Sequence, residues 1–334
     1  MTTGALEGLL YCGNILIPSL FPFAVFAALA VKSGFASWLG KWLTPVTKRL
    51  FHLDGTAGTV ILLGLTGGFP IGAKGVSELY KQGEISKETA QTMTMFLVGG
   101  GPGFIVAVVG VSFFHDIVTG LMLWVCQIAA QILMGIFLCR KRIFSVSHKE
   151  KIRHTSLSVC IVQSVQSGVE SMLSLCGMVI LFSCVFGILD DLRILNMTAV
   201  LLENLSVPVG ISQSIMGVLW EVTKGCNLCF NNAVPLWLMS FALGWGGLCV
   251  HFQIYALTVD LQIPKLKFML CRFLQGLISA GMTVWIFRFY QPVADVYGNF
   301  GKNVVLTSTP TAAGSVAMIG MCILFMLTLL KKPS

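Results

Sequence analysis

The stretch LTGGFPIGAKG, residues 65–75, interrupts a long apolar run with glycines, a proline and a lysine. A second interruption, LVGGGPGF at 97–104, follows within the same apolar region. Glycine and proline are the weakest helix formers, and irregular backbone at membrane depth persists only where it is buried in protein or lines a polar cavity. We therefore expect the two breaks to present backbone polar groups inside the membrane. Close packing of helices through small residues is the alternative.

The composition places the chain among membrane proteins. Its 334 residues are 55% hydrophobic and 11% charged, whereas soluble domains carry about 25% charged residues. Several uncharged runs reach the ~20 residues that a helix needs to cross a bilayer. The sequence predicts an all-α polytopic membrane protein with full spans at 4–31, 116–139, 162–189, 268–290 and 312–331.

Several functional classes are disfavoured by what the sequence lacks. The N-terminal MTTGALEGLLYCGN has no basic segment, so we expect the first span to be retained rather than cleaved as a signal peptide. The net charge of +8 sits in loops, which indicates membrane orientation rather than nucleic-acid binding. Neither a nucleotide-binding P-loop nor a catalytic metal motif is present. We therefore expect no enzyme, no ATP-driven pump, no metal site and no cofactor.

Lysine and arginine predict the orientation, because they collect in short cytoplasmic loops. The segments 140–154 and 32–54 contain six and four of these residues, so both are predicted to be cytoplasmic. The region 55–114 must then cross the membrane a net odd number of times, as one crossing plus a re-entrant hairpin. The same reasoning applies to 200–261, so the two halves are predicted to be inverted relative to each other.

The two halves also share weak sequence similarity. VILLGLTGG at 60–68 aligns with GVLWEVTKG at an offset of 157, and the glycines at 99–101 align with GWG at an offset of 145. We predict a first transmembrane repeat at 1–139, a basic cytoplasmic linker at 140–156, a second and inverted repeat at 157–290, and an extracytoplasmic loop with a C-terminal helix at 291–334.

Inverted repeats with interrupted segments in matching places are typical of secondary transporters. A helix that begins inside the membrane has free N–H groups and a positive dipole end, and both attract anions. We therefore expect alternating access around a central anion site. A proton or sodium gradient is a candidate coupling source, and downhill flux is the alternative.

The residues expected to bind the substrate lie in the four interruptions and just beyond them. They are Gly67, Gly68, Phe69, Pro70, Gly72, Lys74, Gly100, Gly101, Pro102, Glu221, Lys224, Asn227, Gly244, Trp245 and Gly246. Lys74 is expected to offer a charge to a carboxylate, or to begin a solvated insert at 74–88. Glu221 is expected to hold a coupling proton or cation, or to pair with Lys224 at a helix end.

For two of these residues a structural role is the alternative to substrate binding. The amide of Asn227 could contact a polar substrate, or it could lie in an interfacial loop. Trp245 could stack on an aromatic substrate, or it could be a packing tryptophan at the interface. The sequence alone leaves both alternatives open.

The motifs SLFPF at 19–23, GGFPIGAK at 67–74, GGGPGF at 99–104 and the later GWGG resemble those of the YlbJ, or SpoVV, family of sporulation integral membrane proteins. The resemblance covers about residues 4–290. Members of this family carry the nucleoside recognition, or Gate, domain. The resemblance implies a role in endospore formation and a likeness to concentrative nucleoside transporters. It also implies movement of dipicolinic acid across the outer forespore membrane.

Three functions follow as hypotheses. The first is transport of a small organic anion, dipicolinate, in a multi-pass protein of the cell membrane or the outer forespore membrane. The second is nucleoside transport. The third is a non-transporting role in assembly of the spore envelope. The expected partners are the substrate, a coupling ion such as H⁺ or Na⁺, membrane lipid and a second copy of the chain in a homo-oligomer.

Overall fold

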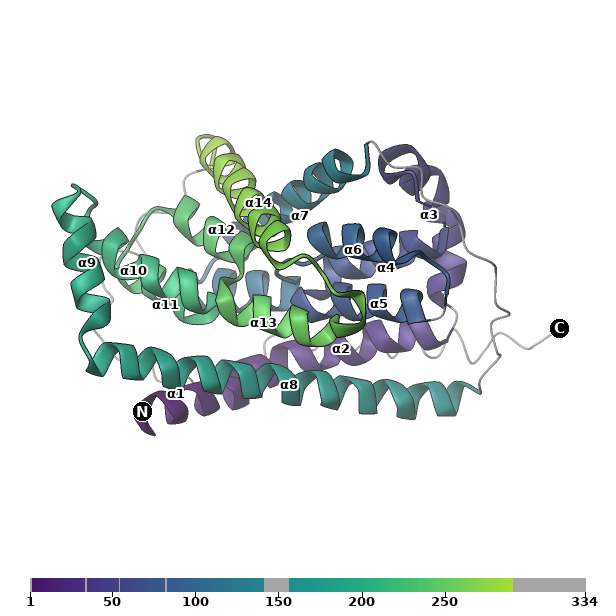
Figure 1. Ribbon diagram of the computed structural model, residues 1–334, viewed down its shortest axis with the longest axis horizontal. Coiled ribbons are helices and arrows are strands. Elements are labelled where there is room, and N and C mark those ends of the chain that lie inside the picture. Colours follow the sequence, from purple (N-terminus) through teal and green to yellow (C-terminus); the bar gives the residue numbers. More distant parts are fainter. Residues whose placement is uncertain (1, 34, 54, 82, 141–155, 291–334) are drawn as a thin grey trace. The chain divides into compact units, whose positions relative to one another are not determined.

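The structure is a computed structural model that describes residues 2–33, 35–53, 55–81, 83–140 and 156–290, and the regular elements in these ranges are helical (Figure 1). The first half contains α1 (Thr2–Tyr11), η1 (Cys12–Leu16), α2 (Ile17–Lys32), α3 (Phe35–Phe51), α4 (Gly55–Gly67), α5 (Phe69–Lys81), α6 (Lys87–Phe96), η2 (Gly103–Phe113) and α7 (Ile117–Cys139). The second half contains α8 (Leu157–Asp191), α9 (Ile194–Asn204), α10 (Val209–Trp220), α11 (Val222–Asn231), α12 (Leu236–Trp245), α13 (Gly247–Leu257), η3 (Val259–Leu261) and α14 (Lys265–Ile286).

Three of the described helices, α7, α8 and α14, are long and apolar enough to cross a membrane. The N-terminal helices add a fourth if Gly4–Leu16 and Leu20–Phe26, which meet at 59°, form one bent span. Large apolar side chains on these helices are exposed, including Phe137 at 73% and Leu173 at 69%. Apolar exposure of this extent suits contact with lipid. The all-α architecture is confirmed, while the predicted span at 312–331 lies outside the described residues.

The helix interruptions predicted from the glycine clusters are present. α4 and α5 are separated by Gly68 alone, whose φ of +93° is a conformation that side-chain-bearing residues rarely adopt. The chain between α6 and η2 leaves the helical conformation at residues 97–101. In the second half, Glu221 separates α10 from α11, and Gly246, with a φ of +83°, separates α12 from α13.

The same order of elements occurs in both halves. A long helical segment is followed by a short amphipathic helix, two interrupted helices and a closing apolar helix. The sequence alignment placed the third interruption slightly too late. Its offset of 157 pairs Gly68 with Gly225, whereas the helix breaks four residues earlier, at Glu221.

The region 32–54 is mostly helical rather than the loop expected from its charges. Within α3, the side chains of Trp38, Trp42 and Val46 recur every four residues and are exposed, and Lys48 and Arg49 lie in the last turn. An exposed stripe of aromatic and apolar residues beside basic residues is typical of a helix that lies in the membrane interface. The predicted insert at 74–88 is likewise helical over its first half, because α5 continues to Lys81.

The long helix α8 packs along α1 and α2, which lie beside it in Figure 1. A glycine permits the close approach of α1 to α8. A Cβ atom added to Gly8 would lie 3.0 Å from the Oγ atom of Ser183. Small residues at such crossings are the usual means by which membrane helices pack closely.

Candidate functional site

The four helix interruptions meet at one place. A Cβ atom added to Gly68 would lie 3.2 Å from the backbone nitrogen of Gly101, so the two interruptions of the first half touch. A Cβ atom added to Gly247 would lie 2.9 Å from the Cα atom of Glu221, so those of the second half touch as well. The Phe69 ring joins the two pairs, since it lies 3.3 Å from a Cβ atom added to Gly246.

A cavity of about 50 Å³ lies at this junction. The interrupted helices form one wall, and the η1–α2 segment and α8 form the other. The first wall contains Gly67, Gly68, Phe69, Pro70, Ile71, Gly101, Phe104, Glu221, Val222, Thr223, Val250 and Gln253. The second wall contains Leu16, Leu20, Ala24, Met172, Leu175 and Val179. The cavity is therefore mainly apolar, and its polar side chains are those of Glu221 and Thr223, at the third interruption, and of Gln253, within α13.

Two half-helices begin at this cavity with different caps. The first residues of α11 line it, and the carboxylate of Glu221 caps them by accepting hydrogen bonds from the backbone nitrogens of Thr223, at 2.9 Å, and Lys224, at 2.7 Å. The first residues of α5 also line it, but they follow Gly68, which has no side chain that could cap them. Pro70 has no N–H and the Ile71 N–H donates to the Gly68 carbonyl at 3.2 Å, so the start of α5 offers a ligand its positive dipole end and the Phe69 N–H.

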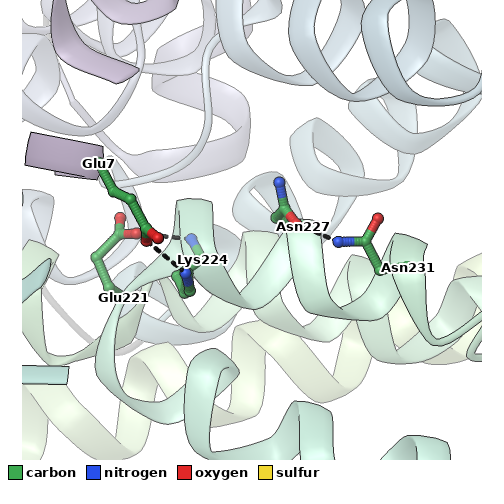
Figure 2. Close-up of polar contacts among 5 residues, drawn as sticks. All are labelled: Glu7, Glu221, Lys224, Asn227 and Asn231. Atoms are coloured by element: carbon green, nitrogen blue, oxygen red, sulfur yellow. Dashed lines mark hydrogen bonds and ion pairs between the residues drawn. The ribbon is translucent and has the colours of Figure 1, made fainter. Parts of the chain in front are cut away.

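A larger polar cleft of about 470 Å³ lies on the other side of Glu221. Its charged lining residues are Glu7, Asp190, Asp191, Glu221 and Lys224. The ammonium of Lys224 lies 3.0 Å from a carboxylate oxygen of Glu7. Figure 2 shows Glu221 beside this pair, with Asn227 and Asn231 further along α11.

Arg272 of α14 is a buried cation that joins the two halves and that the sequence analysis did not select. Its guanidinium donates hydrogen bonds to the carbonyl of Val98, in the second interruption, and to that of Gly244, near the end of α12. It also donates to the Oε1 atom of Gln275, at 2.8 Å. Carbonyls at a helix C-terminus carry partial negative charge, so a cation stabilises them. The available signal was an arginine within an apolar span, which is by default a functional candidate.

Comparison with known proteins agrees with this architecture. Residues 15–116 match the Gate family, which is described as nucleoside recognition. The chain is also 24% identical, over 356 aligned positions, to the sporulation integral membrane protein YlbJ of Bacillus subtilis (strain 168). The alignment covers 95% of this chain and 87% of that protein. The chain is thus similar to the Gate family over residues 15–116 and to YlbJ over most of its length. No solved structure matches it.

The resemblance predicted from the motifs is thus confirmed. The Gate match contains SLFPF, GGFPIGAK and GGGPGF, and it ends at Asp116, immediately before α7. Both interruptions of the first half therefore lie within the residues that match the Gate family.

Of the residues proposed for the site, six line the central cavity. They are Gly67, Gly68, Phe69, Pro70, Gly101 and Glu221. Gly72 and Gly244 are not among the residues that line the cavity and lie at close helix contacts. Gly72 lies against Gly64 and Leu97, and Gly244 lies against Gly276. Gly100 and Pro102 belong to the same interruption as Gly101, but they are not among the residues that line the cavity.

Lys74 points toward α8. Its ammonium donates hydrogen bonds to the Oγ atom of Ser167, at 2.6 Å, to the Ser167 carbonyl, at 3.2 Å, and to the Oγ atom of Ser171, at 3.2 Å. These hydrogen bonds connect α5 to α8. Lys74 therefore neither begins a solvated insert nor lines the cavity.

Of the remaining polar candidates, Lys224 lines the polar cleft, whereas Asn227 and Trp245 are not among its lining residues. Asn227 accepts a hydrogen bond from Asn231, at 2.6 Å. Trp245 is buried, and its Nε1 atom donates to the Leu219 carbonyl at 3.3 Å. Its ring lies against that of His251, with the ring centroids 4.4 Å apart. The packing alternative for Trp245 matches this position.

Proposed function

We propose that this chain is a sporulation-associated membrane transporter that carries a small organic anion, with dipicolinate as the first candidate, by alternating access. The observation that carries the proposal is the convergence of four interrupted helices on one cavity. Interrupted helices that meet at a central cavity are the usual binding architecture of secondary transporters. The similarity to a sporulation integral membrane protein supports the biological setting, and the outer forespore membrane is the location we propose.

We also infer that the two halves are inverted repeats, and matching glycine contacts support this inference. A Cβ atom added to Gly64 would lie 3.2 Å from the Cα atom of Gly72, where α4 meets α5. A Cβ atom added to Gly217 would lie 3.2 Å from the Cα atom of Gly225, where α10 meets α11. A constant offset of 153 relates these pairs and also relates the residues at which the two helices break.

The second interruptions correspond in the same way. Gly99 lies against Gln131 of α7, and Gly244 lies against Gly276 of α14. An offset of 145 relates both members of these pairs. Correspondence of contacts between elements is stronger support for a repeat than glycine matches in the sequence alone, because it depends on the packing as well as the composition.

The chemistry of the cavity suits an aromatic dicarboxylate. Its apolar walls can bury a ring, and the N-terminus of α5 offers its positive dipole end and the Phe69 N–H to a carboxylate. Its volume of about 50 Å³ has room for a few water molecules and not for a ligand of this size. The described conformation is therefore a closed one, and transport requires the cavity to widen.

A nucleoside is the second candidate, because the matching domain is described as nucleoside recognition. Uptake of labelled dipicolinate into proteoliposomes, with uridine and adenosine as competitors, separates the two. We expect saturable dipicolinate uptake that neither nucleoside inhibits. A Gly68→Leu variant should be inactive, since a leucine at a φ of +93° and against Gly101 would close the cavity. Absence of dipicolinate uptake by folded wild-type protein, or uptake of uridine in its place, would overturn the proposal.

The coupling ion can be identified in the same vesicles. Glu221 is the carboxylate that lines the cavity among the described residues, which makes it the candidate binding group for H⁺ or Na⁺. Uptake should be stimulated by an imposed gradient of one of these ions and abolished in Glu221→Gln. Equal uptake with no gradient, with a proton gradient and with a sodium gradient would indicate downhill flux.

A further inference from the structure

Among the described residues that line the central cavity and the polar cleft, Glu221 is the one that lines both. On one side are the apolar walls and the interruptions, and on the other are Glu7, Lys224 and the end of α8. The side chain is 4% exposed, so it fills the space between the two hollows.

The carboxylate is held in this place by α11. Both of its oxygens accept backbone hydrogen bonds, from Thr223 and Lys224, and it thereby supplies the anion that the positive helix end favours. Aspartate, asparagine, serine and threonine are the usual residues at this position of a helix. A glutamate reaches further than any of them, and here it reaches between two hollows.

We propose that Glu221 is the gate between the polar cleft and the central cavity, and that its carboxylate occupies the α11 N-terminus in place of a substrate carboxylate. The second part rests on the proposed function and deepens it, because it names the carboxylate as the group that the site recognises. The first part concerns the passage alone and is independent of the substrate.

The cleft is lined by the carboxylates of Glu7, Asp190, Asp191 and Glu221, so an entering anion is attracted only where Lys224 lies. Lys224 is the one lysine or arginine among the described residues that line the cleft. Its ammonium is also 5.6 Å from the centroid of the Phe186 ring. An arriving carboxylate would displace Glu7 from this ammonium. Lys224 belongs to the same first turn of α11 whose N–H groups Glu221 caps. Transfer of the carboxylate to those N–H groups releases Glu221 and joins the cleft to the cavity.

Thiol accessibility tests the gate without a substrate. Thr223 lines the central cavity and is 6% exposed, so a Thr223→Cys variant places a thiol behind the gate. The full-length protein in detergent is treated with aminoethyl methanethiosulfonate, and the modified peptides are identified by mass spectrometry. In the second variant Glu221→Ser is added, since serine keeps the helix cap but is too short to fill the passage. The matched control is Glu221→Gln, which keeps the size of the side chain.

Adding Glu221→Ser should accelerate modification of the thiol in Thr223→Cys by about tenfold or more, because the passage between cleft and cavity is then open all the time. Glutamine at 221 should leave the rate close to that of Thr223→Cys alone. Equal rates for the serine and glutamine variants would overturn the gate. The native thiols of Cys226 and Cys229 are buried on the same helix and report its packing. Their modification in the serine variant would show that α11 has loosened, and would also contradict the gate.

Equilibrium binding of dipicolinate tests the second part. Removing the tethered charge in Glu221→Gln weakens the internal competitor, so the Kd should fall by about threefold or more. An unchanged or higher Kd would contradict the place-holding role. If the serine variant opens the passage but the protein binds no dipicolinate, the proposed substrate is wrong and the gate stands. If dipicolinate is transported but the passage does not open, the gate is wrong and the transport function stands.

Discussion

The ammonium of Lys224 lies 3.0 Å from the carboxylate of Glu7, which joins the first turn of α11 to α1 across the polar cleft (Figure 2). The side chains are 40% and 59% exposed, so water screens the pair. An exposed pair of this kind contributes about 1 kcal/mol or less to stability. The pair matters instead because it holds the Lys224 ammonium in the same cleft as Glu221, the residue that we propose as the gate to the central cavity.

Neutralising either member of this pair should separate stability from transport. We expect Glu7→Gln and Lys224→Gln to leave the apparent Tm in detergent nearly unchanged. The KM for dipicolinate uptake should rise in Lys224→Gln, which loses the attracting charge, and fall in Glu7→Gln, which frees the ammonium. A change of KM in the same direction in both variants would contradict a role of Lys224 in attracting the substrate.

Arg272 should be essential for stability. Replacement by methionine removes the arginine donor from the buried carbonyl of Gly244 and leaves that of Val98 with only the long hydrogen bond from the Gln275 amide, at 3.4 Å. An unsatisfied buried carbonyl costs about 1–3 kcal/mol. Arg272→Lys should rescue little, because one ammonium on a different stem cannot reproduce the planar fork of donors. The measurement is thermal unfolding in detergent. A lysine variant as stable as the wild type would show that charge alone, without the shape of the guanidinium, holds the two helix ends.

Gly68→Ala should destabilise the protein through its backbone. The φ of +93° costs a residue with a Cβ atom roughly 1–2 kcal/mol, and the added carbon would press on Gly101. Gly177→Ala is the matched control, because nothing lies within 4 Å of its added Cβ in the helix α8. That substitution should be neutral or stabilise by up to about 1 kcal/mol. Equal losses of stability in the two variants would refute a specific strain at the interruption.

Lys74 should act through α8 rather than through the substrate. We expect Lys74→Met to lower the apparent Tm, and the double variant Ser167→Ala with Ser171→Ala to lower it in the same way, because both remove the connection between α5 and α8. Neither should change the KM for dipicolinate severalfold. A large rise of KM in Lys74→Met alone would restore the direct role in binding that the sequence suggested.

Asp116 should make the fold sensitive to acid. It caps α7 by accepting hydrogen bonds from the nitrogens of Val118 and Thr119, and it also accepts from the Tyr290 hydroxyl. Burial alone would raise the pKa of Asp116, but these hydrogen bonds outweigh it and hold the pKa below its usual value. A lowered pKa in the folded state gives stability that is present above the unfolded value, near pH 4, and is lost as the pH falls through the folded value.

Two substitutions test this cap. Asp116→Ala should cost about 1 kcal/mol at neutral pH and remove part of the acid sensitivity. Asp116→Asn should retain most of the stability at neutral pH, since asparagine also caps helices, and should show the same reduced dependence on pH. The measurement is the apparent Tm between pH 3 and pH 7. An aspartate protein and an asparagine protein with identical pH profiles would contradict the assignment.

The helix interruptions could be predicted because they are a local property of glycine and proline. Gly68 breaks its helix with a positive φ angle, which glycine adopts readily, so the break can be expected from the sequence. The alignment pairs Gly68 with Gly225, which is four residues beyond the actual interruption at Glu221. There the helix is restarted by a side chain that caps it, and capping by a glutamate has no strong signature in the sequence.

The site itself was only partly predictable, since it depends on how helices far apart in the sequence pack. Nothing near Lys74 in the sequence indicates that Ser167 will take its ammonium. The apolar wall of the cavity comes from η1, α2 and α8, whose inward residues look like any other lipid-compatible residues. Arg272 was visible as a charge in an apolar span, but its two carbonyl partners were not.

The guanidinium of Arg272 binds helix ends from both halves at once, and this restricts which parts can slide during a transport cycle. Any motion that pulled the two sets of interrupted helices apart at this level would break both bonds inside a dry environment, where the carbonyls could not find water. We therefore expect the interrupted helices to move as one block. The surface expected to yield is the opposite one, where α2 and α8 press apolar side chains against that block and where the hydrogen bonds from Lys74 of α5 to Ser167 and Ser171 of α8 would have to break or move with it.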